Sequence, residues 1–394
     1  MTPIRDSAEL AAFLGQILAG RPLAIDMEFE RERTYRAVLQ LIQLSTGEAE
    51  ALVDPLAIDD LSPLWDVIAD PAVEILFHAG GQDMEIYYDK AQRVPTNVFD
   101  TQVAAALVGL GEQPGYADLV RRVLKHRVKK GERTTDWGNR PLSEAQAEYA
   151  LDDVRHLHAL YDDLNKRLKR MGRTEWLQEE LASYSREDSY VKDVRMLWTR
   201  VSRHRGLERH GLAILRELAQ WREATASRRD IPRNRVIQDD ILIDIARRRP
   251  EKPDDLKALR RLHPRELERS GVELVEAVRR GVECPQEDWP QLFETHEEDP
   301  QLNLTIDLMM VLVKLRAKEA KIGASYMATK RDLNALAYSH AGGSQGRGRL
   351  AEGWRNTLIG EELALLLDGR LALAADPESH YLVVQREGGD SAER

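Results

Sequence analysis

Two acidic residues, Asp26 and Glu28, interrupt an apolar run in the sequence AIDMEFERERTY, which covers residues 24–35. If this run is a β-strand, side chains two positions apart face the same side, so both carboxylates converge on one point. Two like charges held that close repel each other unless a cation lies between them. Chance alone would give about 11 pairs of acids with this spacing in the chain, so the spacing by itself is weak. Because unpaired polar groups at the end of a buried strand are costly, the position favours a binding site.

Three further residues have the right chemistry to complete such a site. Asp83, in HAGGQDMEIYY, lies just inside a predicted helix that follows a buried strand and two glycines. Taken alone, Asp83 is better explained as a first-turn acid that the helix dipole stabilises. Tyr149 and Asp153, in YALDD, are four residues apart and share one helical face, whereas Asp152 points about 100° away. The ordinary alternative for this pair is a solvated helix surface.

The first 165 residues must position these side chains, and they read as alternating strands and helices. Short β-rich runs at 22–29, 38–45 and 50–55 predict an antiparallel meander that opens a sheet. A buried strand is predicted at 73–79. Helices are predicted at 61–70, 81–91, 101–108 and about 143–168. The pattern is typical of a mixed α/β layer fold.

The rest of the chain lacks strand signals and has helical periodicity. From about Gly206 it predicts a compact bundle of four or five helices, and residues 300–371 repeat this plan more loosely. The expected domains are an α/β domain at 1–170, a helical linker at 171–206, all-α domains at 207–287 and 298–375, and a disordered tail at 386–394.

Together, D-x-E on the first strand, Asp at the start of a later helix and Y-x-x-x-D on the last helix resemble the DEDD exonucleases, in their tyrosine-containing branch. Residues 20–165 are similar to the ribonuclease D family through the segments AIDMEFERERTY, LQLIQLSTGE, LVDPL, FHAGGQDMEIY, FDTQVAAAL and TTDWGNRPLSEAQAEYALDDVRHL. Residues 207–285 resemble the helicase-and-ribonuclease-D C-terminal (HRDC) module, and 300–371 resemble a degenerate second copy. The resemblance implies a ribonuclease H-like exonuclease domain, a mixed sheet flanked by helices, followed by two helical bundles.

The same resemblance, carried over residue by residue, implies that Asp26, Glu28, Asp83 and Asp153 bind two divalent ions. Mg²⁺ or Mn²⁺ suits such oxygen ligands. One ion would lower the pKa of a bound water and the other would stabilise the leaving 3′-oxygen, while Tyr149 would orient the water. The implied reaction is 3′-to-5′ hydrolysis of RNA that releases nucleoside 5′-monophosphates. The family suggests the 3′ ends of transfer-RNA precursors as the substrate.

Substrate contacts are expected from His78, Lys129, Lys130, Trp137 and Arg140. The basic stretch KHRVKKGERTTDW at 125–137 lies between the helices of the site and could guide RNA, with Trp137 available to stack on a base. The same stretch is equally explained as a solvated loop around one buried tryptophan. A histidine that ends a buried strand, as His78 does, is more often structural.

Two other segments are not interpreted as sites. Asp100, in FDTQ, precedes a helix and is interpreted as its N-cap. The segment GGSQGRG at 342–348 lacks the lysine and hydroxyl of a phosphate-binding loop. We therefore expect no nucleotide cofactor.

The charge is distributed unevenly, although the net charge is −10. Residues 1–100 contain 7 Lys and Arg against 18 Asp and Glu, whereas residues 201–280 contain 20 against 14. An acidic domain needs metal ions to approach a polyanion, while a basic neighbour can hold the polyanion directly. Ordinary solvated surfaces of two domains would explain the same numbers equally well.

The composition indicates a reducing compartment, for which the cytoplasm is the default. The single cysteine, Cys284, excludes an internal disulfide framework and clustered-cysteine zinc sites. The first 20 residues read as an amphipathic helix and not as a signal peptide. No run approaches the roughly 20 apolar residues that span a bilayer, so no membrane partner is expected.

Two other functions remain open at this point. A catalytically inert RNA-binding protein would use the same helical modules, but it would not be expected to retain every acid. A DNA-directed 3′-5′ exonuclease shares the metal chemistry, and the residues of the site do not exclude it.

Overall fold

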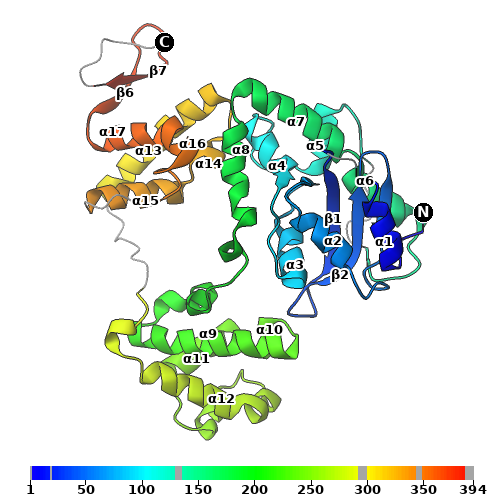
Figure 1. Ribbon diagram of the computed structural model, residues 1–394. Helices are drawn as coiled ribbons and strands as arrows, with labels where there is room; N and C mark the ends of the chain where they lie inside the picture. Colours follow the sequence, from blue (N-terminus) through cyan, green and yellow to red (C-terminus); the bar gives the residue numbers. More distant parts are fainter. Residues whose placement is uncertain (1, 18–19, 129–134, 292–299, 343–347, 387–394) are drawn as a thin grey trace. The chain divides into compact units, whose positions relative to one another are not determined.

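The computed structural model describes residues 2–17, 20–128, 135–291, 300–342 and 348–386 (Figure 1). The chain forms two compact units. The first contains Met1–Met27, Ile42–Arg186 and His296–Arg394, and the second contains Glu28–Leu41 and Glu187–Thr295. The second unit is therefore inserted into the first at two places in the sequence.

A five-stranded mixed sheet with the strand order β3-β2-β1-β4-β5 forms the centre of the first unit. The strands are β1 (Leu23–Glu30), β2 (Val38–Ser45), β3 (Glu50–Val53), β4 (Ile75–Phe77) and β5 (Val98–Asp100). β1 pairs in parallel with β4, β4 pairs in parallel with β5, and β2 pairs antiparallel with β3. Leu23, Ala24 and Ile25 are fully buried because β1 is the middle strand. The predicted mixed α/β fold is confirmed.

Among the described residues up to Leu181, eight helices accompany this sheet, and Figure 1 shows where they lie. They are α1 (Ser7–Leu14), α2 (Ser62–Ala69), α3 (Gly81–Ala91), α4 (Thr101–Leu107), α5 (Tyr116–Val123), α6 (Glu144–Arg155), α7 (Leu157–Met171) and α8 (Thr174–Leu181). A capping box fixes the start of α6, since the side chains of Ser143 and Gln146 each accept a hydrogen bond from the other's backbone amide. The segment predicted to be helical at about 143–168 is helical, but it consists of two helices, because the helix is interrupted at His156.

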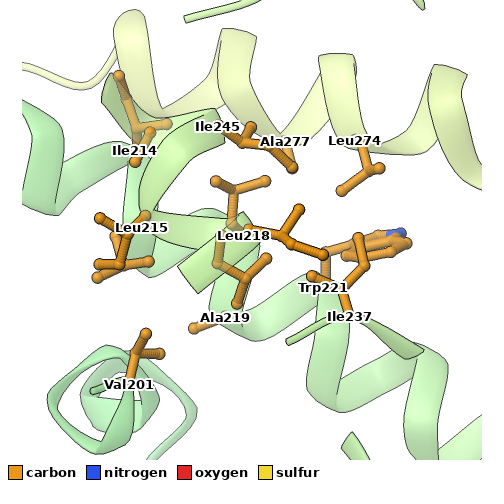
Figure 2. Close-up of a cluster of buried hydrophobic side chains, with 14 of the residues drawn as sticks. Val201, Ile214, Leu215, Leu218, Ala219, Trp221, Ile237, Ile245, Leu274 and Ala277 are labelled. Carbon is orange, nitrogen blue, oxygen red and sulfur yellow. The ribbon is translucent and has the colours of Figure 1, made fainter. Parts of the chain in front are cut away.

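The second unit is a helical bundle of α9 (Arg209–Arg229), α10 (Arg233–Val236), α11 (Asp239–Arg248) and α12 (Pro264–Val282), as predicted. Figure 2 shows its core, in which Leu218 and Trp221 of α9 lie among buried side chains of α11 and α12. Helices α9 and α12 approach closely at Gly281, where an added Cβ would lie 2.4 Å from the Ile214 Cα. Only glycine permits this contact.

Residues 171–206 do not form the expected linker. Helix α8 belongs to the first unit. A 3₁₀ segment, Val194–Arg200, contributes Leu197 and Trp198 to the core of the second unit, and Val201 joins them there. The helical bundle therefore begins before residue 207.

The connection between β1 and β2 also belongs to the second unit. The Tyr35 hydroxyl donates to the Glu223 carboxylate, and the Tyr35 amide donates to Asp230, with 3.1 Å between nitrogen and oxygen. The Arg233 guanidinium lies 5.1 Å from the centroid of the Tyr35 ring. The bundle thus holds the segment that follows the first strand.

The last part of the first unit contains α13 (Pro300–Ala320), α14 (Ala324–Met327), α15 (Lys330–Ala341), α16 (Gly353–Arg355), a π-helical turn at Asn356–Gly360 and α17 (Glu361–Leu367). An antiparallel hairpin of β6 (Leu371–Ala375) and β7 (Leu382–Arg386) follows. The expectation of an all-α domain that ends at 375 is therefore wrong. Gly369, with a φ of +73°, ends the helical stretch in the left-handed conformation that glycine adopts at little cost.

Two tryptophans join this last part to α8. The rings of Trp176 and Trp354 stack with 4.9 Å between centroids and 15° between planes. The Trp354 indole donates to Glu180 over 2.9 Å, and Glu180 also forms an ion pair with Arg355. Arg173, just before α8, donates to the Ala320 carbonyl over 2.6 Å. These contacts fix the last part of the chain against α8 within the first unit.

Three expectations from the sequence concern membrane spans, the glycine-rich segment and the C-terminal tail. None of the helices in the described residues has the length and apolar content needed to cross a bilayer. Residues 343–347 of the glycine-rich segment lie outside the described residues, and so does nearly all of the expected tail at 386–394.

Candidate active site

Three carboxylates converge beside the central strand. Asp26 and Glu28 of β1 and Asp153 of α6 each place an oxygen within 4.8 Å of the others. On β1 they alternate with Ile25 and Met27, which point into the core and are 0% and 4% exposed. The period of two therefore sends both acids to the same face, as the sequence predicts.

The environment of Asp26 favours a bound cation. Burial raises the pKa of Asp26 from 3.8 to about 6, because the charged form is poorly solvated there. A cation among the three carboxylates would offset that cost. All the donors are oxygens, which is the set that Mg²⁺ and Mn²⁺ prefer, so these residues fit a divalent metal ion.

Asp83 occupies the first turn of α3 and is 7% exposed. It is not among the three acids that lie within 4.8 Å of one another. The start of α3 is fixed by Gly80, where an added Cβ would lie 2.5 Å from the Phe77 ring, and by Ala79, whose φ is +58°. Gly80 therefore lets the helix begin close against β4 and sets the position of Asp83.

Asp152 and Asp153 have separate surroundings, although they are neighbours in the sequence. Asp152 pairs with Arg155, which also binds Glu50 on β3 over 2.9 Å and Glu148 over 2.8 Å. Asp153 joins the acids of β1. The interpretation that Asp153 faces the site and Asp152 does not agrees with this arrangement.

Tyr149 lies one turn before Asp153 on α6 and packs against Trp137, with 6.2 Å between ring centroids. Trp137 is only 4% exposed. The expectation that Trp137 stacks on an RNA base is therefore wrong in this structure, because the tryptophan is buried. Residues 129–134 of the basic stretch lie outside the described residues.

Arg140 does not face a substrate. Its guanidinium binds both oxygens of the buried Asp54 at 2.8 Å and donates to the Trp137 carbonyl. This pairing holds the pKa of Asp54 below its ordinary value. The expectation of a substrate contact is corrected to an internal ion pair. Lys129 and Lys130 lie outside the described residues.

His78 is partly buried beside the start of α4. Its Nδ1 lies 2.9 Å from the Thr101 hydroxyl, and its ring meets Tyr116 edge to face at 5.6 Å. Burial lowers the pKa of His78, so the ring is neutral near pH 7. A neutral, packed ring favours the structural explanation over a contact with phosphate.

Asp100 is the N-cap of α4, as predicted, because its carboxylate accepts hydrogen bonds from the amides of Gln102 and Val103. It also accepts from the Ala79 amide and the Tyr184 hydroxyl, each over 3.0 Å. Asp100 thus supports the turn that leads into α3.

Tyr116 is a residue of the site region that the sequence did not single out. Its hydroxyl donates to the Asp152 carbonyl over 2.6 Å and accepts from the His156 amide over 3.3 Å. Its only sequence signal is a position at the start of a helix after Gly115, which gives no hint of a partner 36 residues later.

Comparisons with known proteins agree with this geometry. Residues 1–169 match the 3′-5′ exonuclease family, and residues 211–278 match the HRDC domain. A ribonuclease D of Jannaschia sp. (strain CCS1) is 39% identical over 96% of this chain and 98% of its own. A ribonuclease D of Nitrobacter hamburgensis is 36% identical over 95% and 97%.

A solved structure shares the whole fold. The crystal structure of Escherichia coli RNase D, an exoribonuclease involved in structured RNA processing, matches with a TM-score of 0.83 at 30% identity. The match covers 94% of this chain and 99% of that one. The chain belongs to the ribonuclease D family and is a 3′-to-5′ exoribonuclease.

Proposed function

We propose that the enzyme hydrolyses the 3′-terminal phosphodiester of RNA at a site for two divalent ions, Mg²⁺ or Mn²⁺, and releases nucleoside 5′-monophosphates. The convergence of Asp26, Glu28 and Asp153 within 4.8 Å is the observation that supports this most directly. Asp83 is proposed as the fourth ligand, on its burial in the first turn of α3 and its place in the family pattern.

The acids and the tyrosine of the site have different proposed roles in the hydrolysis. When bound, the ions would lower the pKa of a coordinated water and stabilise charge on the leaving 3′-oxygen. The four carboxylates hold the ions. The Tyr149 hydroxyl orients the attacking water by a hydrogen bond, since Tyr149 lies one helical turn from Asp153 on the same face.

The basic surface of the second unit is proposed to hold the RNA. Many of its arginines are already paired, for example Arg222 with Asp239 and Arg229 with Glu266, so the surplus of positive charge overstates what is available. Within the described residues, several exposed arginines of this unit have no acidic partner at ion-pair distance: Arg209, Arg235, Arg248, Arg260, Arg265 and Arg269.

Two of these arginines make the most specific candidate. Arg265 and Arg269 lie one turn apart on the exposed side of α12, where the spacing allows both to reach one phosphate backbone. We propose this face for long or structured RNA, with transfer-RNA precursors as the physiological class and the cytoplasm as the compartment. Residues 300–371 are proposed as a degenerate second HRDC-like module, on their helical order and shared core.

The decisive experiment uses RNA and DNA oligomers of one sequence, labelled at the 5′ end, with Mg²⁺, Mn²⁺ or EDTA. We expect metal-dependent shortening of the RNA by one nucleotide at a time from the 3′ end. Asp153→Asn should abolish it, whereas Asp59→Asn, which removes an exposed acid from the loop before α2, should not.

The other outcomes are equally informative. Hydrolysis of DNA at the same rate as RNA would favour a DNA-directed exonuclease, and RNA binding without hydrolysis would indicate an inert binding protein. A transfer-RNA transcript with a 3′ extension, compared with an unstructured RNA of equal length, tests the substrate class.

A further inference from the structure

The break between α6 and α7 has an identifiable cause. In an uninterrupted α-helix the amide of residue 156 would donate to the carbonyl of residue 152. Here the Tyr116 hydroxyl bonds to both groups: it accepts from the His156 amide over 3.3 Å and donates to the Asp152 carbonyl over 2.6 Å. The His156 amide also donates to the Val154 carbonyl. A side chain inserted in this way is a recognised cause of a helix kink.

The bonded carbonyl lies next to a proposed metal ligand. The Asp152 carbonyl and the Asp153 amide belong to one planar peptide unit, so the Tyr116 hydroxyl fixes the plane from which Asp153 projects. Burial raises the pKa of Tyr116 well above its ordinary value, and the negative charges of Asp153, Asp26 and Asp152 act in the same direction.

Asp153 is therefore held from two sides. On one side, the Asp152 side chain pairs with Arg155, which is anchored to Glu50 of β3. On the other, Tyr116 is anchored at the start of α5 and packs its ring against His78. Without the hydroxyl, the 152–156 hydrogen bond could reform directly and straighten the helix, which would move Asp153 relative to β1.

We propose that Tyr116 is a positioning residue of the exonuclease site: its hydroxyl, inserted into the helical hydrogen bond beside Asp153, holds the Asp153 carboxylate at the distance from Asp26 and Glu28 that metal binding needs. This inference rests on the proposed role of the three acids as metal ligands. The variant Tyr116→Phe tests it, because it removes one oxygen and keeps the ring that packs against His78.

The primary measurement is the binding of Mn²⁺ alone to the full-length chain. Electron paramagnetic resonance of the free ion monitors this binding. We expect Mn²⁺ affinity to fall by about tenfold, in line with the loss of a group that orients a metal ligand. In assays with RNA, the midpoint of activation by Mn²⁺ should rise by the same factor, with little change in KM for RNA.

Tyr161→Phe is the matched control. Tyr161 lies on α7, where its ring meets Phe99 edge to face, and its hydroxyl is not part of the 152–156 interruption. The same loss of a phenol oxygen there should leave Mn²⁺ binding unchanged, and the melting temperature reports any general loss of stability in either variant.

A double variant separates this inference from the proposed function. If Asp153 is a ligand, Asp153→Asn weakens Mn²⁺ binding, and adding Tyr116→Phe to it has little further effect, because both changes act through one carboxylate. Wild-type Mn²⁺ binding by Asp153→Asn would refute the metal site itself. Weak binding by Asp153→Asn with wild-type binding by Tyr116→Phe would refute only the positioning role.

Discussion

Replacing Asp26 with Asn should stabilise the metal-free protein above pH 6 while it abolishes hydrolysis. Burial raises the pKa of Asp26 from 3.8 to about 6, so folding the ionised carboxylate costs free energy that a neutral amide avoids. At about 1.4 kcal/mol per pKa unit, the cost at neutral pH is about 3 kcal/mol. A site built to bind cations is thus a weak point of the fold when they are removed.

The sign follows from proton binding. Between pH 3.8 and about 6 the folded state keeps a proton on Asp26 that the unfolded chain has already released. The free energy of unfolding of the metal-free wild type therefore falls as pH rises through this window and then levels off. About 2 kcal/mol of the loss is expected between pH 4.5 and 7.5.

Urea unfolding in EDTA, followed by circular dichroism at pH 4.5 and pH 7.5, measures this directly. The stability gain of Asp26→Asn over wild type should be larger at pH 7.5 by about 2 kcal/mol, a comparison in which the titrating groups that do not interact with Asp26 cancel. Asp59→Asn, which removes an exposed charge, should show no such difference. Added Mg²⁺ should stabilise the wild type more than Asp26→Asn.

Two results would refute the reasoning. If Asp26→Asn raised the free energy of unfolding by the same amount at both pH values, burial would not disfavour the ionised carboxylate. Normal hydrolysis by Asp26→Asn would remove Asp26 from the site altogether.

Three other variants, one of them a double variant, test separate parts of the molecule. Tyr149→Phe should bind Mn²⁺ normally but lose about 100-fold in kcat, because the phenol is proposed to orient water and not to bind metal; unchanged turnover would reduce Tyr149 to a core residue. The double variant Arg265→Ala with Arg269→Ala should make the dependence of log K on log salt for single-stranded RNA shallower by about 1.4, at roughly 0.7 per lost phosphate contact. An unchanged slope would place the RNA elsewhere. Arg355→Met should lower the free energy of unfolding by about 3 kcal/mol, because Glu180 loses its partner in a buried pair. If converting Glu180 to Met as well recovers none of that loss, the cost does not come from an unpaired charge.

The parts of the fold that sequence reasoning predicted depend on local pattern. The apolar run that ends in Asp26 and Glu28 has a period of two, which determines the face on which both acids lie. Asp153 was distinguished from Asp152 by its direction on the helix alone, and the Asp100 cap by its residue type before a helix. Each of these inferences needs only neighbours within four residues.

The parts that it missed depend on distant partners. The interruption at His156 is made by Tyr116, 40 residues earlier, and the pairing that removes Arg140 from any substrate lies with Asp54, 86 residues earlier. The two interpretations of Trp137 cannot be separated from the sequence, because the burial of its ring depends on how α6 packs against the loop that contains it. The β6–β7 hairpin was missed because LALAA, with its alanines and leucines, is as typical of a helix as of a strand.

The docking of the last part of the chain on α8 has a consequence during synthesis. Arg173 and Glu180 find their partners at Ala320, Trp354 and Arg355, which are 147 to 175 residues further along the chain. At about 5–20 residues per second, a ribosome needs roughly 7–35 s to deliver those partners. During that interval the nascent chain exposes Trp176 and the Glu180 carboxylate to solvent. The five strands of the central sheet have already emerged by then. This face of α8 is therefore where a chaperone would be most useful and where a stalled or truncated product would be most prone to aggregate.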